Sequence, residues 1–252
     1  PEIVFPIHYP YRTGLTNMLV RNFNHLVQTL DVNSYIKKDN LVVDIGSNDG
    51  TLLKPFFKKG MRVVGIEPTE AADVANKNSI PTFKSFFNKE SVGKVIKKHG
   101  KANIVTATNV FAHINDVDSL VKNVKQLLAK DGLFVSESQY LMDILEKLEF
   151  DTVYHEHLRF YSLTSLKYLL EMHGMSIIDA ERIDAAGGSI RIYAKKGKFP
   201  MSQQAKKLMK SEANAGLYEF KTYLEFANKV IKAREELMHL LFTLKKNGAI
   251  IA

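Results

Sequence analysis

The sequence has no cysteine and no tryptophan among its 252 residues. Without cysteine there can be no disulfide and no thiolate zinc site, so any metal would have to be held by histidines and carboxylates. The sequence also lacks a run of the roughly 18 to 20 apolar residues that a membrane helix needs, and its first residues do not have the pattern of a signal peptide. These absences predict a globular chain in the cytoplasm with no metal site.

The charge is positive but dispersed. The net charge is +8, with 25% charged and 45% hydrophobic residues, enough for one good core. Lysines occur in pairs such as Lys97-Lys98 and Lys206-Lys207, not in one block interleaved with aromatic residues. This pattern favours a solvated surface over nucleic-acid binding, although the positive field would also favour a substrate that carries phosphate.

A glycine-rich turn follows the first strong strand signal. Residues 41–45 form an apolar run typical of a strand buried on both faces, and Gly46 and Gly50 separate this run from a helix expected at 51–59. Gly46 lets the backbone approach a ligand, and Asp44 adds a carboxylate at the end of the strand. The spacing differs from the GxGxxG fingerprint of dinucleotide-binding sites, so a site for a dinucleotide pyrophosphate is less favoured.

A second apolar strand is expected at 62–66, and it ends in Glu67. An acid at this place can accept hydrogen bonds from the two ribose hydroxyls of an adenosyl group. Asp44, Gly46, Gly50 and Glu67, in this order, resemble the S-adenosylmethionine site of class I methyltransferases. The alternative is that Glu67 only caps the helix expected at 70–77.

Strands and helices alternate from residue 41 to about residue 195, which predicts a doubly wound α/β sheet. Five more strands follow the first two, and the resemblance to class I methyltransferases implies seven strands with the last one antiparallel. Asp131-Gly132 is expected to break the chain between a helix and the fifth strand. The later strands are expected at 82–87, 102–108, 133–137, 175–181 and 189–195, and the later helices at 116–130 and 164–173.

The expected domains are 1–40, a loop and a helix at about 15–30; 41–197, the methyltransferase domain; and 198–252, a helical extension. Residues 202–246 are rich in Lys and Glu with few helix breakers, which predicts helix. Residues 249–252 have the pattern of the start of a buried strand. We therefore expect a further domain beyond this chain.

The segment Tyr154-His155-Glu156-His157 is the most distinctive motif, and a loop is expected there. Together with the other motifs it resembles the sugar C-methyltransferases that act on nucleotide-linked keto-deoxyhexoses. Those enzymes carry a zinc-binding module before the methyltransferase domain and a Rossmann-like domain after it, and neither matches this chain. Ala186 stands where relatives often have histidine. The resembling segments are 9–11, 44–53, 65–68, 109–114, 154–162 and 187–191.

Methylation at carbon requires a base against a C–H bond next to a ketone, and hydrogen-bond donors for the developing enolate oxygen. The resemblance implies His157 as the base and Glu156 as its neighbour in the substrate pocket. It also implies Tyr154 and His113 as donors and makes Tyr11 a substrate-site candidate. The cofactor implied is S-adenosylmethionine, with S-adenosylhomocysteine as product. The residues expected to bind it are Asp44, Gly46, Ser47, Asn48, Gly50, Glu67, Pro68, Phe86, Asn88 and Asn109.

Three other interpretations remain open. His155 and His157 could bind a cation, but no third ligand stands at a recognised spacing. The chain could methylate oxygen or nitrogen of another small molecule, a reaction that needs no base aimed at a C–H bond. It could also be a fragment that binds the cofactor without turnover. The partner favoured by the resemblance is a nucleotide sugar.

Overall fold

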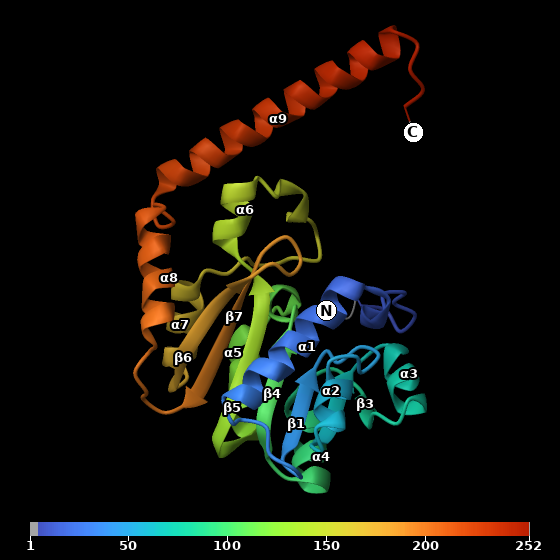
Figure 1. Ribbon diagram of the computed structural model, residues 1–252, viewed down its shortest axis with the longest axis vertical. Helices are drawn as coiled ribbons and strands as arrows, with labels where there is room; N and C mark the ends of the chain where they lie inside the picture. The colour runs from blue at the N-terminus through green and yellow to red at the C-terminus, as the bar shows by residue number, and fades with distance from the viewer. Residues whose placement is uncertain (1–4, 252) are drawn as a thin grey trace.

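A computed structural model describes residues 5–251 and contains one seven-stranded sheet (Figure 1). Its strand order is β3-β2-β1-β4-β5-β7-β6, and β7 runs antiparallel to both of its neighbours, β5 and β6. This confirms the expected doubly wound fold with an antiparallel last strand. The strands are β1 (Leu41–Ile45), β2 (Arg62–Glu67), β3 (Thr82–Lys84), β4 (Ala102–Thr108), β5 (Leu128–Gln139), β6 (Met175–Ile183) and β7 (Ser189–Lys196).

The sheet separates two apolar layers because alternate strand residues point to opposite faces. In β1, Val42 belongs to one cluster, while Val43 and Ile45 belong to the other. Helices α1 (Asn17–Val32), α2 (Leu53–Lys58) and α3 (Ala71–Lys77) contribute buried residues to the first cluster. The opposite face is covered by α4 (Lys89–His99), α5 (Val117–Leu127), α7 (Leu163–Met172) and α8 (Gln203–Asn214).

The fifth strand begins earlier than expected. Asp131-Gly132 was expected to separate it from the preceding helix, but β5 already starts at Leu128 and pairs with Ala102 across a register shift. At Gly132 an added Cβ would lie 2.9 Å from the Ala102 carbonyl oxygen. The glycine therefore permits close strand contact at an irregularity, which is a known use of glycine within strands.

Two helices were not expected from the sequence, α4 and α6 (Leu141–Lys147). The third strand is also shorter than the expected 82–87, because the chain leaves the sheet after Lys84 and turns into α4. Asn88 begins that helix: its side chain accepts a hydrogen bond from the Ser91 amide, and its own backbone amide donates in return to the Ser91 hydroxyl. Local capping thus ends the strand early.

The C-terminal region is helical, as expected, with α8 followed by α9 (Phe220–Lys246). Figure 1 shows α9 projecting away from the sheet, and none of its residues is buried. Residues 249–251, which have the pattern of the start of a buried strand, lie in no helix or strand, and Ile250 is 98% exposed; Ala252 lies outside the described residues. Across residues 5–251, no helix combines the length and apolar character needed to cross a membrane.

Candidate active site

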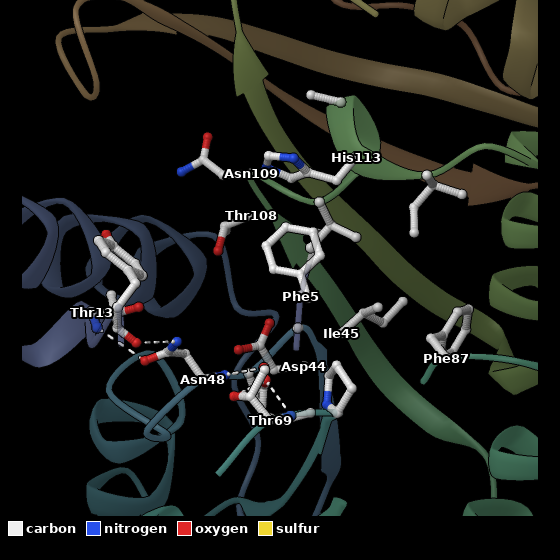
Figure 2. A pocket seen from close by; sticks show the side chains of 18 of the residues that line it. Phe5, Thr13, Asp44, Ile45, Asn48, Thr69, Phe87, Thr108, Asn109 and His113 are labelled. Carbon is white, nitrogen blue, oxygen red and sulfur yellow. Dashed lines mark hydrogen bonds between the residues drawn. The ribbon is translucent and has the colours of Figure 1, made fainter. Parts of the chain in front are cut away.

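A cavity of about 420 Å³ lies where β1, β2, β4 and β5 end, at the edge of the sheet where open α/β folds bind ligands (Figure 2). It has a wall from the N-terminal segment 5–13 and another from the loop after η3 (Phe150–Thr152). This loop carries the Tyr-His-Glu-His motif, and residues 153–160 contain no helix or strand, which confirms the expected loop. The expected site residues found in the lining are Tyr11, Asp44, Gly46, Ser47, Asn48, Glu67, Pro68, Phe86, Asn109, His113, Tyr154, Glu156 and His157.

The glycine-rich turn forms the floor of this cavity. Gly46 has φ +66°, and an added Cβ would lie 2.9 Å from the Val110 side chain. The hydroxyl of Ser47, which also lines the cavity, is buried without a hydrogen-bond partner among residues 5–251. Glycine at position 46 therefore permits the turn to pack closely against Val110, and Ser47 leaves an unpaired polar atom at this turn.

Glu67 is buried, and both of its carboxylate oxygens already accept hydrogen bonds. Oε1 accepts from the Thr69 amide at 2.9 Å and from its hydroxyl at 2.6 Å, while Oε2 accepts from the Asn48 amide at 3.0 Å. A carboxylate oxygen has two acceptor sites. Oε2 therefore keeps one site for a ligand hydroxyl at the cavity.

Asp44 belongs to β1, and its side chain is buried beside β4. The Thr106 hydroxyl donates to its Oδ1 at 2.6 Å. Burial is the main cause that raises the pKa of Asp44 to about 7; the Thr106 hydrogen bond opposes this shift, and the charges of Glu67 and Glu137 add to it. No salt bridge involves Asp44 or Glu67 within residues 5–251. A positively charged ligand at this end of the cavity would favour the ionised form of Asp44.

Two expected cofactor residues do not line the cavity. Gly50 has φ +77° and packs against Ile80, where an added Cβ would lie 2.9 Å from the side chain. Asn88 serves as the N-cap of α4. Both lie outside the lining, so their contribution is to the shape of the turn and of the helix.

The two histidines of the site have defined orientations. The ring centroids of His113 and His157 are 5.1 Å apart. Nδ1 of His157 lies 2.8 Å from the Thr152 carbonyl oxygen, and Nδ1 of His113 lies 2.8 Å from that of Glu156. Because a carbonyl only accepts, each Nδ1 donates, and each neutral ring keeps its lone pair on Nε2.

This orientation suits His157 as a base and changes the expectation for His113. Burial lowers the pKa of His113, which favours its neutral form, although the bond to the Glu156 carbonyl opposes the shift. A neutral ring whose Nδ1 donates to a carbonyl has no second N–H. His113 therefore offers the cavity an acceptor rather than the expected donor.

The carboxylate of Glu156 is flanked by two tyrosines. Oε2 accepts from the Tyr9 hydroxyl at 3.3 Å and from the Tyr154 hydroxyl at 3.5 Å, a longer contact. Burial, with Glu156 next, raises the pKa of Tyr9 to about 12 and also raises that of Tyr154. Both phenols remain protonated donors at neutral pH.

Sequence reasoning missed Tyr9 and Phe5. It favoured Tyr11, which lines the cavity with its side chain about half exposed. Tyr9 reaches Glu156 across 147 residues of sequence, and the Phe5 ring contacts the edges of Tyr9 and His113 at centroid distances of 5.0 Å. The only signal available was the Tyr-Pro-Tyr spacing, which does not say which ring turns inward.

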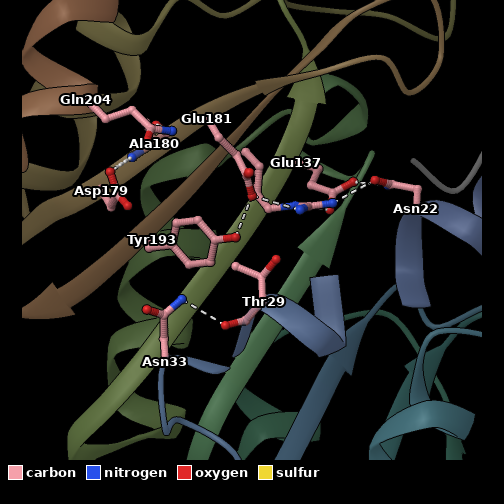
Figure 3. Close-up of polar contacts among 10 residues, drawn as sticks. Asn22, Thr29, Asn33, Glu137, Asp179, Ala180, Glu181, Tyr193 and Gln204 are labelled. Carbon is pink, nitrogen blue, oxygen red and sulfur yellow. Dashed lines mark hydrogen bonds and ion pairs between the residues drawn. The ribbon is translucent and has the colours of Figure 1, made fainter. Parts of the chain in front are cut away.

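A buried ion network fixes α1 beside the cavity (Figure 3). The Arg191 guanidinium is 0% exposed and donates to Glu137 at 2.6 Å, to Glu181 at 2.8 Å and to Asn22 of α1 at 2.6 Å. Asn22 donates in turn to Glu137. The same helix places Leu19 and Phe23 in the cavity lining.

The metal interpretation has no support in the geometry. Within residues 5–251 no group of three or more histidine, cysteine or carboxylate side chains could hold an ion. His155 also lies outside the cavity lining.

Sequence comparison gives two family matches. Residues 19–180 match the methyltransferase domain family, and residues 184–252 match the C-methyltransferase C-terminal domain. C-methyltransferase NovU of Streptomyces niveus is 32% identical over 100% of this chain, which spans 60% of that relative's length. Ribosomal protein L11 methyltransferase of Clostridium perfringens is 35% identical over 50% of this chain and 42% of its own length.

Structure comparison gives the same fold. Magnesium protoporphyrin IX methyltransferase from Synechocystis PCC 6803, solved with bound SAH, has a TM-score of 0.57 at 14% identity, covering 71% of this chain and 84% of its own. A methyltransferase from Clostridium acetobutylicum, described as S-adenosylmethionine-dependent, has a TM-score of 0.56 at 12% identity, covering 71% and 92%. Because the methyltransferase domain family matches residues 19–180, more than half of the chain, the chain belongs to that family, whose cofactor is S-adenosylmethionine.

Proposed function

We propose that this chain carries the catalytic domain of a C-methyltransferase that acts on the carbon next to the ketone of a nucleoside-diphosphate-linked deoxysugar. The observation that carries the proposal is the pair of imidazoles, His113 and His157. Their Nδ1 atoms are used by backbone carbonyls, which leaves the lone pair of each neutral ring on Nε2, and they line the same cavity as Glu156 and its two tyrosines. Transfer to oxygen or nitrogen does not require a base of this kind aimed at a C–H bond. The similarity to C-methyltransferase NovU supports the same reaction class.

In the proposed mechanism His157 accepts the proton of the sugar carbon on Nε2, while its Nδ1–H remains bonded to the Thr152 carbonyl. Tyr154 donates toward Glu156 in the structure, and its phenol, when turned to the substrate, can donate to the developing enolate oxygen. His113 accepts a hydrogen bond from a sugar hydroxyl. These groups bind, orient and move a proton at one end of the cavity.

The other end of the cavity fits the cofactor. Glu67 would accept from ribose hydroxyls, the backbone at Gly46 and Ser47 would border the methionine part, and Asp44 would face its positive charge. Phe86 would border the adenine. When bound, S-adenosylmethionine supplies the methyl group as an electrophile. Residues 41–197 form the cofactor-binding domain in this proposal.

The proposal is tested with the full-length gene product and a panel of thymidine-, uridine- and guanosine-diphosphate keto-deoxyhexoses. Methyl transfer from labelled S-adenosylmethionine should place a new C–CH₃ group next to the ketone, detectable by NMR. With S-adenosylhomocysteine bound, the sugar hydrogen should exchange with deuterated solvent. Methylation of oxygen or nitrogen without such exchange would show that the chemistry is of the other class.

Glu67→Ala should weaken cofactor binding while the protein stays folded. Loss of a charged hydrogen-bond acceptor costs about 1.5 to 3 kcal/mol, which corresponds to about tenfold to more than a hundredfold in Kd. Calorimetric titration with S-adenosylhomocysteine measures it. Glu70→Ala is the control, because the Glu70 side chain is partly exposed and pairs with His8. Unchanged affinity in Glu67→Ala would remove this residue from the cofactor site.

A further inference from the structure

The side chain of Asn48 makes hydrogen bonds to the N-terminal segment and to its own turn. Its Oδ1 accepts from the Thr13 amide at 3.0 Å and from the Asp49 amide at 2.9 Å, and its Nδ2 donates to the Tyr11 carbonyl at 3.1 Å (Figure 2). The Asn48 backbone amide donates to Glu67. Asn48 therefore joins the acid of the cofactor end to residues 11–13.

Its neighbour Asp49 holds the same segment. Oδ2 of Asp49 accepts from the Gly14 amide at 3.0 Å, and an added Cβ at Gly14 would lie 2.7 Å from that oxygen. Closer to the N-terminus, the Ile7 carbonyl accepts from the amide of Glu70, a residue of the turn after β2. The turn after β1 and the turn after β2 thus fix the path of the segment.

Tyr9 lies between these attachment points, and its hydroxyl donates to Glu156. The Glu156 carbonyl in turn accepts from His113. Hydrogen bonds and short stretches of backbone therefore connect Glu67 through Asn48 and Tyr9 to Glu156 and the His113 imidazole. Tyr9 and Glu156 are 147 residues apart in the sequence.

We propose that Asn48 and Tyr9 are positioning residues that couple the two ends of the cavity. Asn48 fastens the segment to the turn that borders the cofactor, and Tyr9, carried by the segment, holds Glu156 in place for the sugar. The inference rests on the proposed function, since it assigns a task within the same site. A ligand that orders the turn then orders the sugar end, so each ligand strengthens binding of the other.

The test measures the coupling between the two ligands. The Kd of the nucleotide sugar found active in the panel is determined by calorimetry with and without S-adenosylhomocysteine. We expect the cofactor product to tighten sugar binding by about 5-fold or more, the lower end of typical coupling. Asn48→Gly keeps a residue that tolerates the local φ of +49° while it removes the side-chain bonds. It should abolish the coupling, and so should Tyr9→Phe.

The double variant Asn48→Gly/Tyr9→Phe should lose no more coupling than either single variant, because both act through one connection. Ser79→Gly is the matched control, since Ser79 also has a positive φ of +61° but lies outside the cavity lining. It should keep the wild-type coupling. Deuterium exchange of the sugar hydrogen should slow in Asn48→Gly although this residue is not near Glu156 in the sequence.

If the wild-type protein methylates a nucleotide sugar but S-adenosylhomocysteine does not change the Kd of that sugar, the inference is overturned while the proposed function stands. Asn48→Gly with full coupling, or with a loss confined to S-adenosylhomocysteine affinity, would have the same effect, since Asn48 would then serve only the cofactor. If the wild-type protein binds none of the nucleotide sugars of the panel, the proposed function is overturned, and the inference with it.

Discussion

His157→Asn is expected to abolish methyl transfer and, with it, exchange of the sugar hydrogen with deuterated solvent. Both reactions pass through the same carbanion-like state, and Nε2 of His157 is the proposed acceptor of the proton. Loss of general-base catalysis costs about 10²- to 10⁴-fold in rate. Binding of S-adenosylhomocysteine should stay unchanged, which shows that the cofactor end is intact. Kinetics and NMR exchange on the full-length protein measure both effects.

The comparison with His113→Asn decides between the two imidazoles. Since both rings keep a lone pair on Nε2, His113 is the alternative base. We expect His113→Asn and Tyr154→Phe to slow both reactions while exchange remains detectable. Exchange that persists in the His157 variant and disappears in the His113 variant would transfer the role of base to His113.

Arg191→Met is expected to destabilise the protein by about 3 to 5 kcal/mol, because it leaves Glu137 and Glu181 without their cation. Typical domains are stable by only about 5 to 15 kcal/mol, so much of the folded margin would be lost. The change also removes the bond to Asn22 and loosens α1 at the cavity. Denaturant unfolding measures the difference.

Two further variants make this result specific. Lys167→Met removes a solvent-exposed pair with Glu171 and should move the unfolding midpoint little. Adding Glu137→Gln to Arg191→Met should recover part of the loss, since one uncompensated charge disappears. Equal midpoints for Arg191→Met and wild type would show that the buried charges are compensated by other means.

The features that sequence predicted are local. Asp44, Gly46 and Glu67 stand at the ends of apolar strands, and parallel strands bring such ends to one edge of a sheet. The roles in the histidine motif came from its resemblance to sugar C-methyltransferases, because spacing within the segment does not determine which side chains face the substrate.

The features that sequence missed depend on contacts between distant segments. Tyr9 and Tyr11 differ by the direction of a ring, which only the path of residues 7–14 decides. In the sequence, Arg191 has the pattern of an ordinary residue of β7. Its role becomes visible only in the fold, where Asn22 of α1 lies beside it. The start of β5 at Leu128 likewise depends on its pairing with Ala102, which overrides the local tendency of Asp131-Gly132 to break the chain.

The proposed cofactor site would link the stability of this protein to the supply of its methyl donor. Asp44 and Glu67 are buried, and no cation pairs with them among the residues that the structure describes, whereas Glu137 has Arg191. A ligand that binds only the folded form adds about 2.7 kcal/mol of stability at a hundredfold excess over its Kd. We therefore expect the protein to unfold more often without S-adenosylmethionine than with it, and a cell short of the cofactor would then degrade it sooner.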